Sequence, residues 1–158
     1  MAEIFADREN MANLKMSGGT GEDLPYDDST FDLVLCVSSH QYMDIRSALR
    51  EMHRVLRPGG EVHIIGGTFP TYLNGVGKML ISQPRRYGKE YLKTIVNTMS
   101  YSYFGSRVLV SKSAWSTSAP IYPTSSKMDQ WFRQSGFSQR QPDIQIFPET
   151  SFSRVKEA

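Results

Sequence analysis

Apolar and polar residues follow one another along the chain in a pattern that predicts an α/β fold. Phe31–Val37 is a nearly continuous apolar run between turn residues, which is typical of a strand buried on both faces of a parallel sheet. Over residues 45–56, apolar side chains recur at helical spacing, and Asp44 is a suitable N-cap. Pro58 and the two glycines after it end this helix, and residues 61–65 predict a second strand. Together these elements predict a right-handed crossover between two parallel strands.

Weaker patterns flank this unit. Residues 3–13 predict a helix before it, and residues 73–81 and 91–99 predict two helices after it. Residues 126–135 predict a final helix that ends in a glycine, and residues 138–147 predict a last strand at the edge of the sheet. From these elements we expect a core cluster with the following members: Val34, Cys36, Leu49, Met52, Val55, Val62, Ile64 and Trp131.

The middle of the chain has a different composition, rich in serine, threonine and tyrosine over residues 68–125. Within it, residues 100–126 contain many aromatic side chains and few charges, so we expect an irregular lid or a long loop there. At 158 residues the chain has the length of one domain. We therefore interpret residues 1–158 as one domain with residues 68–125 as an insertion.

Composition excludes several classes of protein. Cys36 is the only cysteine, so neither an intrachain disulfide nor a cysteine-based zinc site is expected, and a reducing, cytoplasmic setting is the default. The first ten residues do not resemble a signal peptide, and no apolar run is long enough to span a membrane, so we expect no membrane partner. The acidic residues between positions 22 and 32 lack the spacing of metal ligands, and we expect no metal site.

Charge is distributed unevenly. Residues 1–45 hold two basic and nine acidic side chains, whereas residues 46–93 hold nine basic and three acidic ones. A basic stretch can attract nucleic acid. The arginines at positions 46, 50, 54 and 57, however, lie opposite the apolar stripe of a predicted helix, as on a solvated face, and no nucleic-acid-binding motif accompanies them. We expect no nucleic-acid partner.

The carboxyl ends of the parallel strands are the expected place for a site, because ligands bind there in open α/β sheets. His40 follows the first strand directly, so it is a candidate base or substrate contact, and the alternative is a histidine that only caps a loop. His53 and His63 fall within a predicted helix and strand and are expected to be structural.

Two segments resemble a known family. GTGEDLPYDDSTFDLVLCV (residues 19–37) and ALREMHRVLRPGG (residues 48–60) resemble the class I S-adenosylmethionine-dependent methyltransferases of the small-molecule type, with a weaker similarity in the 125–137 helix. The similarity covers roughly residues 6–66. It implies a Rossmann-like sheet of order three-two-one-four-five-seven-six, in which residues 31–37 form the fourth strand, with residues 68–125 on the substrate side. It also implies S-adenosylmethionine as cofactor.

The chain departs from the family pattern in the cofactor motifs. It lacks the glycine-rich first motif and the acid that binds the ribose, as expected for an N-terminally truncated member. Thr20 stands where the family usually has an aspartate for the adenine amino group. The resemblance leaves an adenine side made of Thr20, Gly21, Glu22, Val37 and Ser38. We therefore expect weak or no S-adenosylmethionine binding by the isolated chain.

The resemblance implies methyl transfer to a small-molecule substrate if a complete site is assembled, with His40 as candidate base. The alternative is a truncated, non-catalytic binding subunit or a gene fragment. Without the family's first strand, residues 31–37 would have an open edge, which favours pairing with other strands. We expect a re-paired sheet or a homo-oligomer, formed through this edge or through the aromatic segment 101–122.

Overall fold

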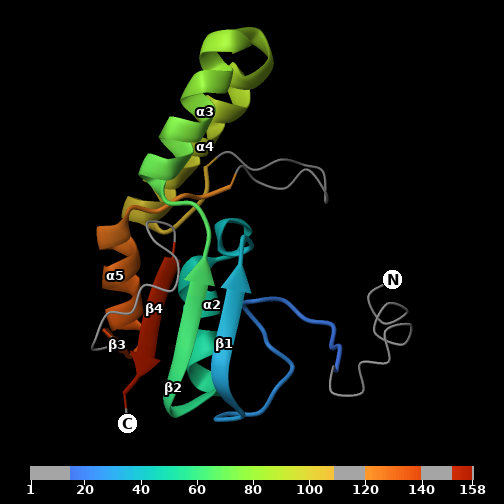
Figure 1. Cartoon of the computed structure of the whole chain (residues 1–158), viewed down its shortest axis with the longest axis vertical. Coiled ribbons are helices and arrows are strands. Elements are labelled where there is room, and N and C mark those ends of the chain that lie inside the picture. Colours follow the sequence, from blue (N-terminus) through green and yellow to red (C-terminus); the bar gives the residue numbers. More distant parts are fainter. Residues whose placement is uncertain (1–14, 109–119, 140–150, 158) are drawn as a thin grey trace.

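The computed structural model describes residues 15–108, 120–139 and 151–157 (Figure 1). The helix predicted over residues 3–13 lies outside the described residues, and so does most of the strand predicted over residues 138–147.

The crossover unit is confirmed. Strand β1 (Phe31–Val37) is followed by a short 3-10 helix η1 (His40–Tyr42), helix α2 (Ile45–Val55) and strand β2 (Leu56–Ile65). β1 and β2 are parallel, with Val34 opposite Val62 and Cys36 opposite Ile64. Asp44 caps α2, since its Oδ1 accepts a hydrogen bond from the Ser47 amide at 3.1 Å. The periodicity of the sequence therefore places this unit correctly.

β2 begins earlier than predicted. The chain leaves α2 at Leu56 in an extended conformation and continues through Gly59, whose φ of 79° lies in the left-handed region. Glycine adopts this conformation without a steric penalty, so the segment after the helix turns directly into the strand.

The complete sheet has the order β1-β2-β4-β3. β4 (Ser151–Lys156) runs antiparallel to β2, and the short β3 (Phe137–Gln139) runs antiparallel to β4. This order agrees with the four-five-seven-six part of the sheet that the resemblance implies. Among the described residues β1 pairs with β2 alone, without the re-pairing that we expected, and forms the edge of the sheet.

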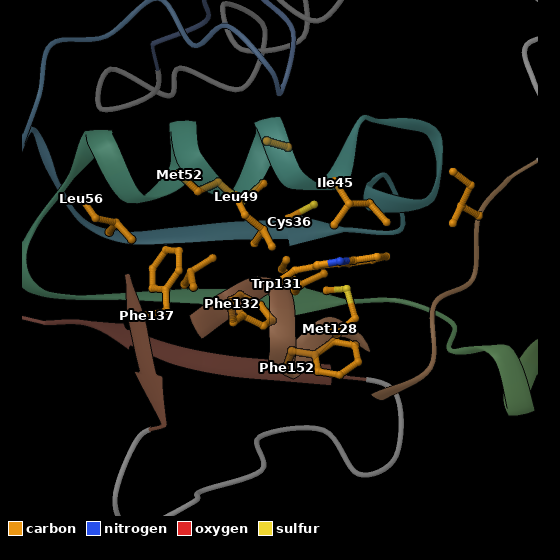
Figure 2. Close-up of a cluster of buried hydrophobic side chains, with 14 of the residues drawn as sticks. Cys36, Ile45, Leu49, Met52, Leu56, Met128, Trp131, Phe132, Phe137 and Phe152 are labelled. Carbon is orange, nitrogen blue, oxygen red and sulfur yellow. The ribbon is translucent and has the colours of Figure 1, made fainter. Parts of the chain in front are cut away.

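The core lies on one face of the sheet, beneath α2 and α5 (Ser125–Gln134) (Figure 2). Seven of the eight predicted core residues are buried, and Val34 is half-buried against them. Aromatic rings from α5, β3 and β4 complete the cluster: Trp131, Phe132, Phe137 and Phe152. α5 ends at Gln134, and Gly136 follows as the predicted C′ glycine, with a φ of 88°.

The other face of β1 is open, which corrects the expectation of a strand buried on both faces. Leu33, Leu35 and Val37 are 55%, 60% and 53% exposed. The apolar run was correctly interpreted as a strand, but none of the described helices covers this side of it. Burial on both faces requires a second layer of helices.

Two long helices lie within residues 68–125, the segment that we interpreted as an insertion. α3 (Phe69–Ser82) and α4 (Pro84–Phe104) make a hairpin that projects beyond the carboxyl ends of β1 and β2 (Figure 1). α4 ends at Gly105, whose φ is 74°. The expectation of an irregular segment over residues 100–126 is therefore wrong at both ends, since α4 reaches Phe104 and α5 begins at Ser125. Residues 109–119 lie outside the described residues.

Candidate functional site

A turn carries three of the predicted cofactor residues. Thr20 and Asp23 form an isolated antiparallel bridge, and the Asp23 amide donates to the Thr20 carbonyl at 3.2 Å, with Gly21 and Glu22 between them. The Glu22 carboxylate accepts a hydrogen bond from the Asp44 amide at 2.6 Å. This contact ties the turn to the beginning of α2, close to the carboxyl end of β1.

Arg54 and Glu51 hold the segment after this turn against α2. Arg54 donates to the backbone oxygens of Leu24 and Tyr26, and the Leu24 amide donates to the Glu51 carboxylate at 3.1 Å. Arg54 also binds Glu51 directly, and these hydrogen bonds lower the pKa of Glu51 to about 2. Part of the arginine-rich face of α2 therefore positions the candidate site.

A pocket of about 240 Å³ opens between the turn and the edge of β1. Thr20 and Gly21 lie on its rim, and most of its wall is apolar: Val34, Leu35, Cys36, Met43 and Met52. At Gly21 a Cβ atom would come within 2.5 Å of the Met43 sulfur, so the backbone approaches the pocket wall closely there. An apolar slot with a hydroxyl at its rim suits a planar heterocycle with polar edges.

Val37 and Ser38 stand apart from this pocket. Both are exposed, and the Ser38 amide donates to the Ile65 carbonyl at 2.7 Å, which extends the β1–β2 pairing. Ser39, which the sequence did not single out, lines the pocket instead, and its Oγ lies 3.3 Å from the buried Cys36 sulfur. The structure thus brings together Thr20, Gly21 and Ser39.

His40 is 2% exposed and lies beneath the glycine pair that follows β2. A Cβ atom at Gly66 would come within 2.3 Å of the imidazole ring, so this close packing requires glycine. Burial lowers the pKa of His40, and the Gly67 backbone offsets this only in part. The imidazole is therefore neutral at physiological pH and shielded from solvent.

The other histidines make structural contacts, as predicted. His63 Nδ1 lies 2.8 Å from the Ser153 hydroxyl, and its Nε2 lies 3.1 Å from Glu61. His53 packs edge-on against Phe137. Within the part of the chain that the structure describes, no cluster of metal-ligating side chains occurs.

Three stacked tyrosines stand above the carboxyl ends of the strands. The ring of Tyr72 lies 4.4 Å from that of Tyr122 and 5.8 Å from that of Tyr91, each pair within 16° of parallel. Tyr122 reaches Gly67, where a Cβ atom would lie 3.1 Å from its ring. We call Tyr72, Tyr91 and Tyr122 the tyrosine wall. The sequence shows that residues 68–125 are rich in tyrosine, but only tertiary packing shows which rings meet.

Comparison with known proteins supports the resemblance to methyltransferases. Residues 1–64 match the model of a family described as a methyltransferase domain. The chain is 35% identical over 66 residues to the uncharacterized methyltransferase YcgJ of Bacillus subtilis, an alignment of 41% of this chain and 26% of that protein. It is 40% identical over 63 residues to demethylmenaquinone methyltransferase of Staphylococcus epidermidis, covering 39% and 26%.

A third relative is the phthiotriol/phenolphthiotriol dimycocerosates methyltransferase of Mycobacterium tuberculosis, 48% identical over 54 residues, or 34% of this chain and 20% of that protein. The chain thus spans about a fifth to a third of the length of the curated relatives it matches.

Solved structures show the same fold. The crystal structure of YcgJ matches with a TM-score of 0.53 at 19% identity, over 87% of this chain and 47% of that one. PH0226 from Pyrococcus horikoshii matches with a TM-score of 0.55 at 14% identity, over 99% and 64%. Residues 1–64 are therefore similar to a methyltransferase domain, and the fold of the chain resembles that of solved structures with this domain.

Proposed function

We propose that the chain takes part in S-adenosylmethionine-dependent methyl transfer to a small molecule, in the cytoplasm, by supplying the adenine side of the cofactor site. The pocket between the Thr20–Asp23 turn and β1 is the observation that carries this proposal. Its Thr20 hydroxyl can hydrogen-bond the edge of an adenine ring, and its apolar wall can pack against the ring face. Relatives named for demethylmenaquinone and phthiotriol support a small-molecule acceptor.

The residues present fit the adenine ring and not the whole cofactor. At about 240 Å³ the pocket is smaller than the roughly 300–1,000 Å³ of sites that enclose a drug-sized ligand. No acidic side chain lines it among the described residues, and Glu22 is already bound to the α2 N-terminus. The ribose and methionine portions would need partners from outside this pocket, so weak binding by the isolated chain remains our expectation.

The acceptor would lie at the carboxyl ends of β1 and β2, beneath the tyrosine wall. S-adenosylmethionine supplies an activated methyl group when bound, and the protein then acts mainly by holding acceptor and cofactor in line. Tyr72 and Tyr122 offer an aromatic surface on which an acceptor ring can stack. His40 remains the candidate base, since a neutral imidazole can take up a proton, although Gly66 and Gly67 must move before an acceptor reaches it.

The second candidate is a non-catalytic methyltransferase-like binding subunit. It is favoured by the position of β1 at the edge of the sheet and by a pocket lining without an acidic side chain, both among the described residues. In either case we propose that the edge and open face of β1 bind a second copy of the chain, because β1 is an apolar edge strand whose one charged residue, Asp32, is paired with Arg57.

Two single glycine substitutions test the proposed adenine site. Titrating adenosine into the labelled chain should shift the amide resonances of Thr20, Gly21 and Ser39. Gly21→Ala places its Cβ against Met43, which must then shift in the pocket wall, and should weaken these shifts, whereas Gly18→Ala meets nothing within 4 Å and should preserve them. Shifts confined to residues elsewhere, or unchanged by Gly21→Ala, would refute the assignment. A low-micromolar dissociation constant for S-adenosylmethionine, measured by calorimetry, would refute the expectation that the isolated chain binds this cofactor weakly.

A further inference from the structure

Helix α4 turns its polar side inward and its apolar side outward. Its inward face carries buried polar side chains: Thr94, Asn97, Thr98, Ser100 and Ser102. Leu92, Met99 and Tyr103 point outward, 62%, 46% and 66% exposed. A surface helix of a globular protein normally has the opposite arrangement. The outer face of α4 therefore requires a specific explanation.

The inward polar groups are satisfied within the protein. The Thr98 hydroxyl accepts a hydrogen bond from the Tyr122 amide at 3.2 Å, and the Ser100 hydroxyl donates to the Ser106 carbonyl at 2.9 Å. At the end of the helix, Tyr101 packs edge-on against Trp131. These contacts fix the rotation of α4 about its axis, so the outward position of its apolar side chains follows from packing.

The outward residues form one stripe at alternating spacings of four and three positions, which we call the α4 stripe: Arg85, Lys89, Leu92, Val96, Met99 and Tyr103. Residues at this spacing lie on one helix face. Arg85 and Lys89 are exposed at the hairpin tip, and Val96 is half-buried. At the other end, the Lys127 ammonium lies 5.0 Å above the Tyr103 ring. The apolar centre of the stripe thus has cations at both ends.

The tip of the α3–α4 hairpin, residues 78–93, adds to the positive charge of the α4 stripe. Residues 78–93 contain five basic residues and one acidic residue, and the acid, Glu90, lies 3.9 Å from Lys93. Ile81, at the end of α3, is 86% exposed. The tip projects away from the sheet, where it can reach an extended surface without obstruction from the core (Figure 1).

We propose that the α4 stripe and the hairpin tip dock on the surface of an anionic lipid bilayer. α4 has 21 residues and is therefore about 32 Å long. A helix with an apolar face and accompanying cations can lie in the plane of the bilayer interface, with lipid phosphates as partners for the cations.

This proposal departs from the expectation of no membrane partner, which was based on the lack of a spanning segment. No helix in the described residues is long and apolar enough to cross a bilayer. A helix that lies on the surface does not need that length of apolar sequence. A second copy of the chain fits the stripe less well, because the stripe positions offer no acidic partner for Arg85 and Lys89.

Vesicle flotation with the full chain tests the proposal. The chain should float with vesicles of phosphatidylcholine and phosphatidylglycerol, float less as salt is raised, and remain unbound with phosphatidylcholine alone. Leu92→Gln combined with Met99→Gln should abolish flotation. Arg85→Gln and Lys89→Gln should each weaken binding about fivefold, the loss expected for one cation at an anionic surface.

Matched controls lie elsewhere on the chain. Leu33→Gln with Leu35→Gln removes exposed apolar side chains from β1, and Arg133→Gln removes an exposed charge from α5, so both should leave flotation unchanged. Circular dichroism checks that every variant is folded. Absence of flotation, or flotation unaffected by the stripe variants, would overturn the proposal. A dimer that Leu92→Gln disrupts, without vesicle binding, would assign the stripe to a second copy. No outcome depends on methyltransferase activity.

Discussion

The two faces of β1 both carry apolar side chains and have opposite surroundings. On one face, Cys36, Val62 and Ile64 are at most 5% exposed beneath α2 and α5. On the other, Leu33 and Leu35 are more than half exposed. The local sequence of β1 is apolar on both sides, so the difference comes from what packs against each face.

On the open face, the side chains of β1 are apolar, whereas several of those on β2 and β4 are polar. Leu33 and Leu35 lie opposite Glu61 and His63 of β2, and His63 lies opposite Ser153 of β4. His63 and Ser153 are buried and hydrogen-bond each other. The uncovered apolar surface is thus concentrated on β1, the strand whose outer edge also lacks a partner among the described residues. This coincidence supports the proposal that β1 binds a second copy of the chain.

The largest expected effect comes from the covered face. Leu49→Ala removes a side chain that is fully buried between α2 and the sheet, and should lower the free energy of unfolding by about 2–5 kcal/mol. Urea denaturation measures this change. Leu35→Ala is the matched control on the open face and, at a concentration low enough to keep the chain monomeric, should change it by about 0.5 kcal/mol or less. Equal losses from the two variants would show that both faces are covered in solution.

Sequence reasoning succeeded where local periodicity determines the element. β1 was identified by its apolar run and α2 by apolar residues at helical spacing. The end of α5 was identified by the glycine that follows it. It missed β4, where one aromatic residue, Phe152, is the main inward anchor of a strand of mostly polar residues. It also assumed a second helix layer over β1, because an apolar run does not show which of its sides is covered.

The candidate site likewise combines residues that the sequence identified with residues that it did not. Thr20, Gly21 and Glu22 were identified through the resemblance, and the structure places them together in one turn. Ser39 and the tyrosine wall come together only through tertiary packing, because the three tyrosines belong to segments far apart in the chain. No local pattern identifies such contacts.

A smaller effect is expected at the beginning of α2, which links the covered face to the site. Asp44→Ala removes the cap of α2 and the acceptor of the Tyr101 hydroxyl, at 2.8 Å, and should cost about 0.5–2 kcal/mol. Tyr101→Phe keeps the cap and should cost less. Urea denaturation compares the two variants, and a larger loss from Tyr101→Phe would contradict the assigned role of Asp44.

A still smaller effect should appear as a pH dependence of stability. Burial lowers the pKa of His40 below its ordinary value of 6.5, so the unfolded chain takes up a proton before the folded chain does. The free energy of unfolding should therefore be greatest above pH 6.5 and fall as the solution becomes more acidic. His53 contributes in the same direction, since burial and Lys156 lower its pKa.

Denaturation between pH 5 and pH 8 measures this slope. His40→Gln should flatten it in part, and His40→Gln with His53→Gln should flatten it further. A slope that is the same in the wild type and the double variant would show that neither imidazole is shielded from protons.

Light scattering of the purified chain tests the central claim, that the open side of β1 is an interface. The account predicts a mass above the 17.9 kDa of one chain that rises with concentration. Leu33→Lys with Leu35→Lys should return the mass to that of the monomer, and Leu92→Gln on α4 should not. A monomer at every concentration, or an assembly that the β1 variants leave intact, would contradict the account.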